Sequence, residues 1–392
     1  MKRSTDRIRT THTGSLPRPA DVFAIMRIVA AGKPYDRDAY EDALTRHVAD
    51  IVKKQVDAGI DVVNDGEVSK ISFQHYLTER LDGFEARVPP GGLGPPTGPI
   101  GLDGEDAKMF PDYYANVLKN NPFTDVIPVA PRVCVGPIRY VGQKQIARDI
   151  ANLKAAMAAA GADEGFLPAS VPVPDAMTNE HYKSDEEYFT AYGDAMRVEY
   201  QAILDAGLLL QIDFPRLVSG WDGRKGKTLA EYRKWAEGRI ELLNHALRGL
   251  PEDRIRFHTC YGVNIGPRVS DLQLEAIADV IFKIRAGAYS FEAANPRHEH
   301  EWRVPAKVKV PDGKILIPGM VTHSNPMIEH PETVADRIER WANAVGRENL
   351  LVGNDCGFQS TAGNTEIPIT VAWAKLRALG EGARIASRRL WG

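Results

Sequence analysis

The stretch YQAILDAGLLLQIDFP, residues 200–215, contains the pattern that decides the fold. An amphipathic helix pattern ends at Ala206-Gly207, where glycine can take the left-handed conformation that closes a helix, and a short apolar strand follows at once. The stretches KKQVDAGIDVVNDGE at 53–67 and IFKIRAGAYSFEA at 281–293 repeat this design. Each is typical of the helix-to-strand half of a repeating βα unit.

Reading outward from these stretches gives strands in a regular series. They are expected at 10–15, 61–65, 165–170, 208–213, 256–260, 288–292, 315–322 and 350–355. Helical patterns separate most of them, for example 185–207, 228–249 and 331–346, the last with Pro at its start and Gly at its end. The series favours an α/β fold, a (β/α)₈ TIM barrel over residues 1–392, whose chemistry would lie at the C-terminal strand ends. A doubly wound open sheet is the alternative.

One long segment, 68–163, interrupts the series between the second and third strands. It contains VPPGGLGPPTGPIGLDGEDAKMF, which is too rich in Pro and Gly for a helix or strand. The stretch VAPRVCVGPIRYVGQK that follows resembles a hairpin of two strands. We interpret 68–163 as an insertion over the barrel mouth; a linker between two domains is the alternative.

Composition narrows the class of protein. A net charge of -3, with Lys and Arg scattered, gives no footprint for nucleic acid or an anionic membrane. The start MKRSTDRIRTTHTG has no apolar core segment, and no later stretch approaches the length that spans a bilayer. The cysteines Cys134, Cys260 and Cys356 lie far apart, which favours reduced thiols and a cytoplasmic protein. A homo-oligomer is compatible with the sequence.

Candidate metal ligands lie at three of the strand ends. His258 and Cys260 alternate onto one face of their strand, Glu292 ends the next strand, and Cys356 follows the last one. Two thiols, an imidazole and a carboxylate are the set and number that favour tetrahedral zinc. His and Cys also occur as ordinary buried residues, and for the isolated HTC pattern that reading is the more usual one.

These residues resemble a known family. The motifs are HTC at 258–260, FEA around Glu292, NDCG around Cys356, HTGSLPRP near the start, DGE at 65–67, QIDFP at 211–215 and THSN at 322–325. In their order along the chain these motifs resemble the catalytic barrel of the cobalamin-independent methionine synthases. In extent the chain is similar to single-barrel relatives, which include archaeal-type methionine synthases and epoxyalkane:coenzyme M transferases.

The resemblance implies an enzyme, a zinc-dependent transferase of the methionine biosynthesis type. Zn²⁺ held by His258, Cys260, Glu292 and Cys356 would bind a thiol substrate, which coordination deprotonates although its free pKa is about 8.5. A small-molecule thiol and an alkyl donor are therefore the expected partners. Glu292 is expected to loosen when the thiol binds.

The resemblance also assigns the substrate residues. Glu67 and Asp213 match two acids that bind the ammonium group of homocysteine, and an ion pair with a nearby Arg or Lys is the alternative for each. Gly14 and Ser15 match a turn that meets the amino-acid carboxylate; Ser15 as an ordinary turn residue is the alternative. His323 matches a histidine that supplies a proton, and a structural capping histidine is equally compatible.

Two departures concern the alkyl donor. The tryptophan that stacks on folate in the family is absent after the third strand, and the family's Asp-Glu-Pro is Asp213, Phe214 and Pro215. The leading hypothesis is methyl transfer from a methyltetrahydrofolate-type donor to homocysteine. The second hypothesis is addition of a thiol to an epoxide, as in the coenzyme M transferases. In this hypothesis Arg216 and the charged run at 297–300 would hold an anionic group of the substrate. A non-catalytic zinc or thiol binder is the third.

Overall fold

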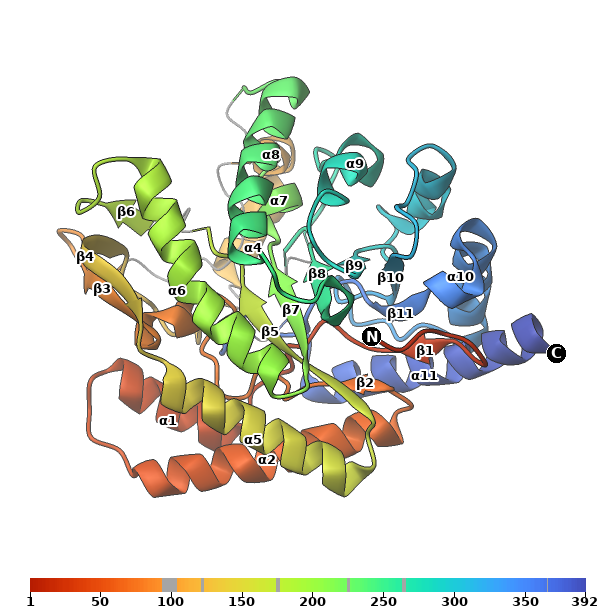
Figure 1. Cartoon of the computed structure of the whole chain (residues 1–392), viewed down its shortest axis with the longest axis horizontal. Coiled ribbons are helices and arrows are strands. Elements are labelled where there is room, and N and C mark those ends of the chain that lie inside the picture. Colours follow the sequence, from red (N-terminus) through yellow and green to blue (C-terminus); the bar gives the residue numbers. More distant parts are fainter. Residues whose placement is uncertain (94–103, 121–122, 174–176, 224–225, 263–265, 365) are drawn as a thin grey trace.

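The fold is a closed parallel barrel in a computed structural model, which describes residues 1–93, 104–120, 123–173, 177–223, 226–262, 266–364 and 366–392 (Figure 1). Its strands are β1 (Arg9–Thr10), β2 (Val62–Val63), β5 (Glu164–Ser170), β7 (Leu209–Asp213), β8 (Ile255–His258), β9 (Ala288–Phe291), β10 (Ile315–Val321) and β11 (Leu351–Asn354). They form one 8-stranded sheet in the order β1-β11-β10-β9-β8-β7-β5-β2. All neighbours are parallel, and a parallel bridge between Thr11 and Val62 joins its two ends. The (β/α)₈ prediction is confirmed, and the open sheet is excluded.

Helices surround the barrel in the connections between strands. They are α1 (Ala20–Ala30), α2 (Arg37–Asp57), α5 (Gln143–Ala160), α6 (Asp185–Asp205), α7 (Arg216–Ser219), α8 (Leu229–Ala246), α9 (Ala278–Ile281), α10 (Pro331–Val345) and α11 (Ile369–Trp391). Local chemistry sets their starts: Thr228 and Glu231 form a capping box on α8, and Ser184 caps α6. None of the described helices is long and apolar enough to cross a membrane.

The Ala-Gly junctions follow the sequence prediction at two of three sites. Gly59 and Gly207 have φ of 81° and 87°, in the left-handed region expected after a helix. Gly287 does not have a positive φ, and the helix before it, α9, has only 4 residues. A Cβ on Gly287 would lie 2.7 Å from the carbonyl oxygen of Glu252. The prediction was wrong there because this glycine permits close approach of two backbones instead.

Two strands of the segment 68–163 and one strand that follows β5 form a small second sheet beside the barrel. Strands β3 (Leu81–Ala86), β4 (Arg132–Tyr140) and β6 (Met177–Asn179) form it, with β3 antiparallel and β6 parallel to β4. The hairpin expected at 129–144 is not present: that stretch forms the single strand β4, whose antiparallel partner comes from far earlier in the chain. Two short helices, α3 (Glu105–Met109) and α4 (Pro111–Lys119), lie between β3 and β4.

The boundaries of the insertion stay a proposal. Helix α5 occupies the end of 68–163 and packs against α2, so it takes the place of the outer helix between β2 and β5. Residues 94–103 of the Pro- and Gly-rich loop lie outside the described residues. We propose one barrel domain over 1–392, with the additional structure concentrated before α5.

Apolar packing fills one end of the barrel and leaves the other for polar groups. The interior cluster comprises Val62, Phe166, Leu209, Ala288, Ile315, Ile317 and Leu351. Above it the guanidinium of the fully buried Arg256 lies 4.1 Å from the ring centre of Phe166 and donates to Thr11 Oγ1. The chemistry-bearing residues begin at the next level, at the C-terminal strand ends.

Candidate metal and thiol site

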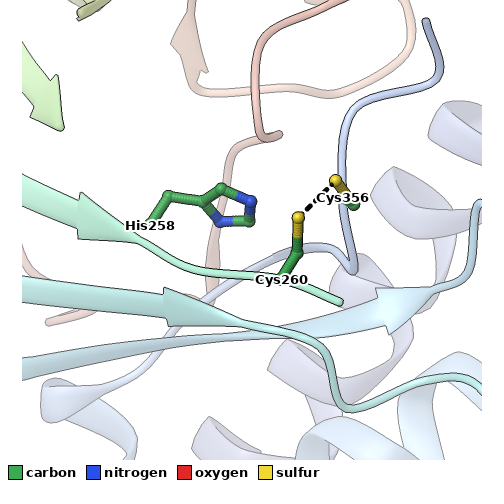
Figure 2. A group of neighbouring side chains, drawn as sticks. All are labelled: His258, Cys260 and Cys356. Atoms are coloured by element: carbon green, nitrogen blue, oxygen red, sulfur yellow. Dashed lines mark hydrogen bonds between the residues drawn. The ribbon is translucent and has the colours of Figure 1, made fainter. Parts of the chain in front are cut away.

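His258, Cys260 and Cys356 converge at the C-terminal rim of the barrel, with their side chains pointing toward one another (Figure 2). Their ligand atoms all lie within 4.8 Å of one another, and all three residues are buried. His258 ends β8, Cys260 follows two residues later, and Cys356 comes two residues after β11. Parallel strand order therefore brings together residues that are almost a hundred positions apart.

The imidazole of His258 is arranged to accept a metal. Its Nδ1 lies 3.1 Å from Ser290 Oγ on β9, which suits the tautomer with the proton on Nδ1. Its Nε2 is buried and has no hydrogen-bond partner among the described residues. Burial, and then the positive charge of Arg256, lower the pKa of His258 to about 3. A neutral ring with a buried free lone pair is what a metal ligand requires.

The two thiols are also suited to a metal. Cys260 Sγ and Cys356 Sγ are 2.7 Å apart. Their hydrogen bond, and then burial, raise the pKa of Cys356 well above its ordinary value. A divalent cation would reverse this, because coordination deprotonates thiols. The sulfur, sulfur and nitrogen set fits Zn²⁺.

Glu292, the fourth expected ligand, lies beside this group and outside it. It directly follows β9, and its carboxylate accepts hydrogen bonds from the backbone N–H of Tyr261 at 2.8 Å and from Asn295 Nδ2 at 2.8 Å. Arg268 Nη1 forms an ion pair with it at 3.0 Å. Burial alone would raise the pKa of Glu292, but Arg268, together with His323, His298 and the Tyr261 N–H, outweighs burial and lowers it. The carboxylate is therefore ionised and held by protein donors.

Glu67 and Asp213 open into the same cavity as the three metal-binding candidates. This cavity, of about 650 Å³, is lined by both acids together with His258, Cys260 and Cys356. Glu67 Oε2 is buried without a hydrogen-bond partner among the described residues, and its backbone has φ 55°, which is uncommon for a residue other than glycine. Burial, and then the nearby charge of Glu67, raise the pKa of Asp213 well above its ordinary value. A cationic group between the two acids would give Glu67 Oε2 a partner and would favour the ionised form of Asp213.

Gly14 and Ser15 lie next to these acids. A Cβ on Gly14 would lie 3.1 Å from Glu67 Oε1 and 2.9 Å from Asn64 Nδ2, and φ is +136°, so only glycine fits. Ser15 lines the cavity, and its carbonyl oxygen accepts the backbone N–H of Phe358. The turn thus borders both the acids and the loop that carries Cys356.

His323 lies behind the cavity lining. The ring is fully buried, Nε2 is 3.0 Å from the carbonyl oxygen of Gly262, and Nδ1 has no hydrogen-bond partner among the described residues. Burial lowers its pKa. In this arrangement the ring is neutral, and a role as proton donor requires it to gain a proton from substrate or solvent.

Sequence reasoning missed three residues that support the site. Asp355 accepts the backbone N–H groups of residues 293–295 and fixes the loop after β9. Lys70 is buried, donates to the carbonyl oxygen of Pro168, and lowers the pKa of Asp213. Arg268 pairs with Glu292. Only Asp355, as the neighbour of Cys356, carried a signal in the sequence.

The charged run at 297–300 is paired with acids outside the cavity lining. Arg297 Nε lies 2.7 Å from Asp271 Oδ1, and the buried ring of His298 lies between Asp271 at 2.7 Å and Glu301 at 3.2 Å. Burial alone would lower the pKa of His298, but these two acids raise it to about 9. The ring also stacks on Tyr261 at 4.0 Å. Of the suggested anion-binding residues, Arg216 is the one that lines the cavity.

The raised pKa of His298 predicts a pH-dependent contribution to stability. The stabilisation of the folded protein by protonated His298 is fully present below the unfolded-state pKa of about 6.5. It is lost as pH rises through the folded-state pKa of about 9. Between pH 6 and pH 10 the free energy of unfolding of the wild type should fall by roughly 2–3 kcal/mol more than that of His298→Gln. Urea unfolding at the two pH values measures this. Equal falls in both proteins would contradict it.

Fold and site together define a (β/α)₈ barrel with a candidate metal and thiol site at its C-terminal rim. The family model for the cobalamin-independent synthase catalytic domain matches residues 8–90 and 164–375, and the chain belongs to this family. The unmatched residues between these two ranges include β4 and α5.

Relatives match nearly the whole chain. The methionine synthase of Saccharolobus islandicus (strain Y.G.57.14) is 24% identical over 384 residues, covering 97% of this chain and 95% of that protein. That of Sulfurisphaera tokodaii is 23% identical over 389 residues, covering 97% and 93%. The B12-independent methionine synthase from Shewanella sp. W3-18-1 has a TM-score of 0.67 and 19% identity, covering 98% and 99%. A putative B12-independent methionine synthase from Listeria monocytogenes has a TM-score of 0.64.

Proposed function

We propose that the protein is a zinc-dependent transferase that moves a methyl group from a small-molecule donor onto the sulfur of homocysteine. The observation that carries this proposal is one cavity lined by His258, Cys260 and Cys356 and by the acids Glu67 and Asp213. Homocysteine has a thiol for the first set and an ammonium group for the second. Membership of the synthase family, and relatives named methionine synthase, support it.

The residues divide the work between them. His258, Cys260 and Cys356 would hold Zn²⁺, with Glu292 as the exchangeable ligand; the ion would supply an anionic, nucleophilic substrate sulfur at neutral pH. Glu67 and Asp213 bind the ammonium group, and Gly14 and Ser15 border the amino acid. These contacts orient the sulfur toward the donor before reaction, which lowers the entropic cost of the transfer step.

The leaving group needs a proton, and we propose that His323 supplies it. The buried ring lies close enough to Glu292 for that carboxylate to favour its protonated form. The proton that the substrate thiol releases on binding, or a proton from solvent, would charge the ring, and the ring would pass it to the leaving group.

The lining of the cavity supports a second candidate, addition of the thiol to an epoxide. None of the described residues that line it is a tryptophan, the residue that stacks on folate in the family. Phe73, Ile127, Pro128 and Val129 give it an apolar wall, and Arg216 is a cation at the rim. This wall suits a small apolar electrophile, and Arg216 suits a thiol substrate that carries an anionic group.

Turnover assays separate the candidates. We expect the zinc-loaded protein to convert L-homocysteine and a methyltetrahydrofolate into methionine, and His323→Asn to lower kcat about 100-fold with little change in thiol binding. Mass spectrometry of the products measures both. Turnover only with an epoxide plus coenzyme M would select the second candidate. No transfer in either assay, with thiol binding intact in His323→Asn, would indicate a zinc or thiol binder instead.

We place the enzyme in the cytoplasm, in keeping with its free thiols.

A further inference from the structure

Arg268 is a cation built into the edge of the metal group. It follows β8 and reaches back so that Nη1 lies 3.0 Å from Glu292 Oε2 and Nη2 lies 3.2 Å from the carbonyl oxygen of Gly262. Its side chain is 10% exposed, and that of Glu292 is 0% exposed. The guanidinium is therefore a direct partner of Glu292, one of the four candidate ligands.

Both oxygens of the Glu292 carboxylate are occupied by protein donors. Oε1 accepts the N–H of Tyr261, and Oε2 accepts Arg268 and Asn295. In this position Glu292 lies outside the group whose atoms are within 4.8 Å of one another. To bind the same ion the carboxylate would have to shift toward the three candidate ligands, and this shift would weaken its present hydrogen bonds and ion pair. We call the position of Glu292 in this structure, outside the group of three candidate ligands and bound by protein donors, the retracted position. The carboxylate would have to leave this position to act as a metal ligand.

Charge decides which position is favoured. Zn²⁺ with two thiolates is neutral, a substrate thiolate brings the site to about -1, and a buried Glu292 brings it to about -2. Arg268 returns the sum to about -1 and supplies an ion pair and hydrogen bond for the retracted carboxylate. Without Arg268, the carboxylate of Glu292 in its retracted position would be a buried charge with too little compensation. Binding to the metal ion would then be the more favourable state for Glu292.

We propose that Arg268 is a positioning residue that holds Glu292 in its retracted position and so lets a substrate thiolate take the fourth ligand place. The inference rests on the proposed function, because it requires a metal and a thiol substrate. In the exchange a metal–oxygen bond to Glu292 is replaced by a metal–sulfur bond, and the thiol proton leaves to the His323 ring or to solvent. Arg268 contributes to thiol affinity and not to metal retention.

Cobalt substitution tests this without any turnover assay. Co²⁺-loaded wild type and Arg268→Gln are titrated with L-homocysteine, and the sulfur-to-cobalt charge-transfer absorption reports the added thiolate. We expect the dissociation constant for homocysteine to rise at least 10-fold in Arg268→Gln. The metal content should stay at one ion per chain, and the metal dissociation constant measured without thiol should not increase.

Two further variants make the test specific. In a Glu292→Gln background there is no carboxylate charge to hold, so adding Arg268→Gln should change the homocysteine dissociation constant less than 2-fold. Arg297→Gln is the matched control, since that guanidinium pairs with Asp271 and is not among the donors to Glu292. It should behave as the wild type.

Three results would overturn the inference. They are unchanged homocysteine affinity in Arg268→Gln, an equal loss of affinity in the Glu292→Gln background, and loss of the metal from Arg268→Gln, which would indicate a purely structural role. A wild type that binds no metal would remove the proposed function as well, so the two failures are distinguishable.

Discussion

Cys356→Ser is expected to lose its zinc almost completely, from one ion per chain to less than a tenth of that, and to lose all transfer activity. Cys356 supplies one of two sulfur ligands in a group of three closely placed residues. A hydroxyl is a far weaker ligand than a thiolate for Zn²⁺, and the remaining ligands cannot compensate. Metal analysis after gel filtration in a weak chelator measures the loss.

Cys134 provides the control for that experiment. It is also buried and free, but it lies on β4 in the second sheet, where its Sγ is 3.4 Å from the carbonyl oxygen of Gly136. Cys134→Ala should keep the full zinc content. If Cys134→Ala emptied the site, or if Cys356→Ser kept its zinc, the ligand assignment would be wrong.

Asp213→Asn is expected to raise the KM for L-homocysteine about 100-fold or more. Removing one charged partner from a buried ammonium–carboxylate contact costs about 2–5 kcal/mol. The free protein should fold normally, because burial and Glu67 already favour the neutral form of Asp213 when no cation is present. The loss therefore appears in substrate binding and not in stability.

A thiol without an ammonium group makes the test selective. 4-Mercaptobutanoate, which is homocysteine without its amino group, should bind the wild type weakly and bind Asp213→Asn at least as well. Glu67→Gln should show the same preference, and Asp205→Asn on the exposed end of α6 should behave as the wild type. Equal losses for both thiols in Asp213→Asn would mean that this acid does not recognise the ammonium group.

The sequence was sufficient to predict the barrel and to bring together three of the four candidate ligands. Apolar strands following Ala-Gly helix ends have a pattern that few folds share, and strand ends of a barrel must meet at one rim. For this reason His258, Cys260 and Cys356 could be placed together although Cys356 is distant in the chain. Glu67 and Asp213 were paired by the resemblance to the family, and both line one cavity in the structure.

Three features could not be predicted from the sequence, because they depend on contacts that no local pattern encodes. Arg268 reaches Glu292 from an irregular loop, and the direction of a long side chain in a loop is set by packing. The pairing of β3 with β4 joins strands separated by the long 87–131 connection, so a local hairpin was the natural but wrong expectation. Gly287 looked like a helix end because close backbone approach and left-handed turns select the same residue.

X-ray absorption at the zinc edge, recorded with and without L-homocysteine, tests whether the substrate sulfur binds the ion held by Cys260 and Cys356. We predict a four-coordinate ion with two sulfur ligands in the free enzyme and three after the thiol is added, with one nitrogen or oxygen ligand lost. A sulfur count that stays at two on addition of saturating homocysteine would contradict this prediction, as would a zinc ion with fewer than two sulfur ligands in the free enzyme.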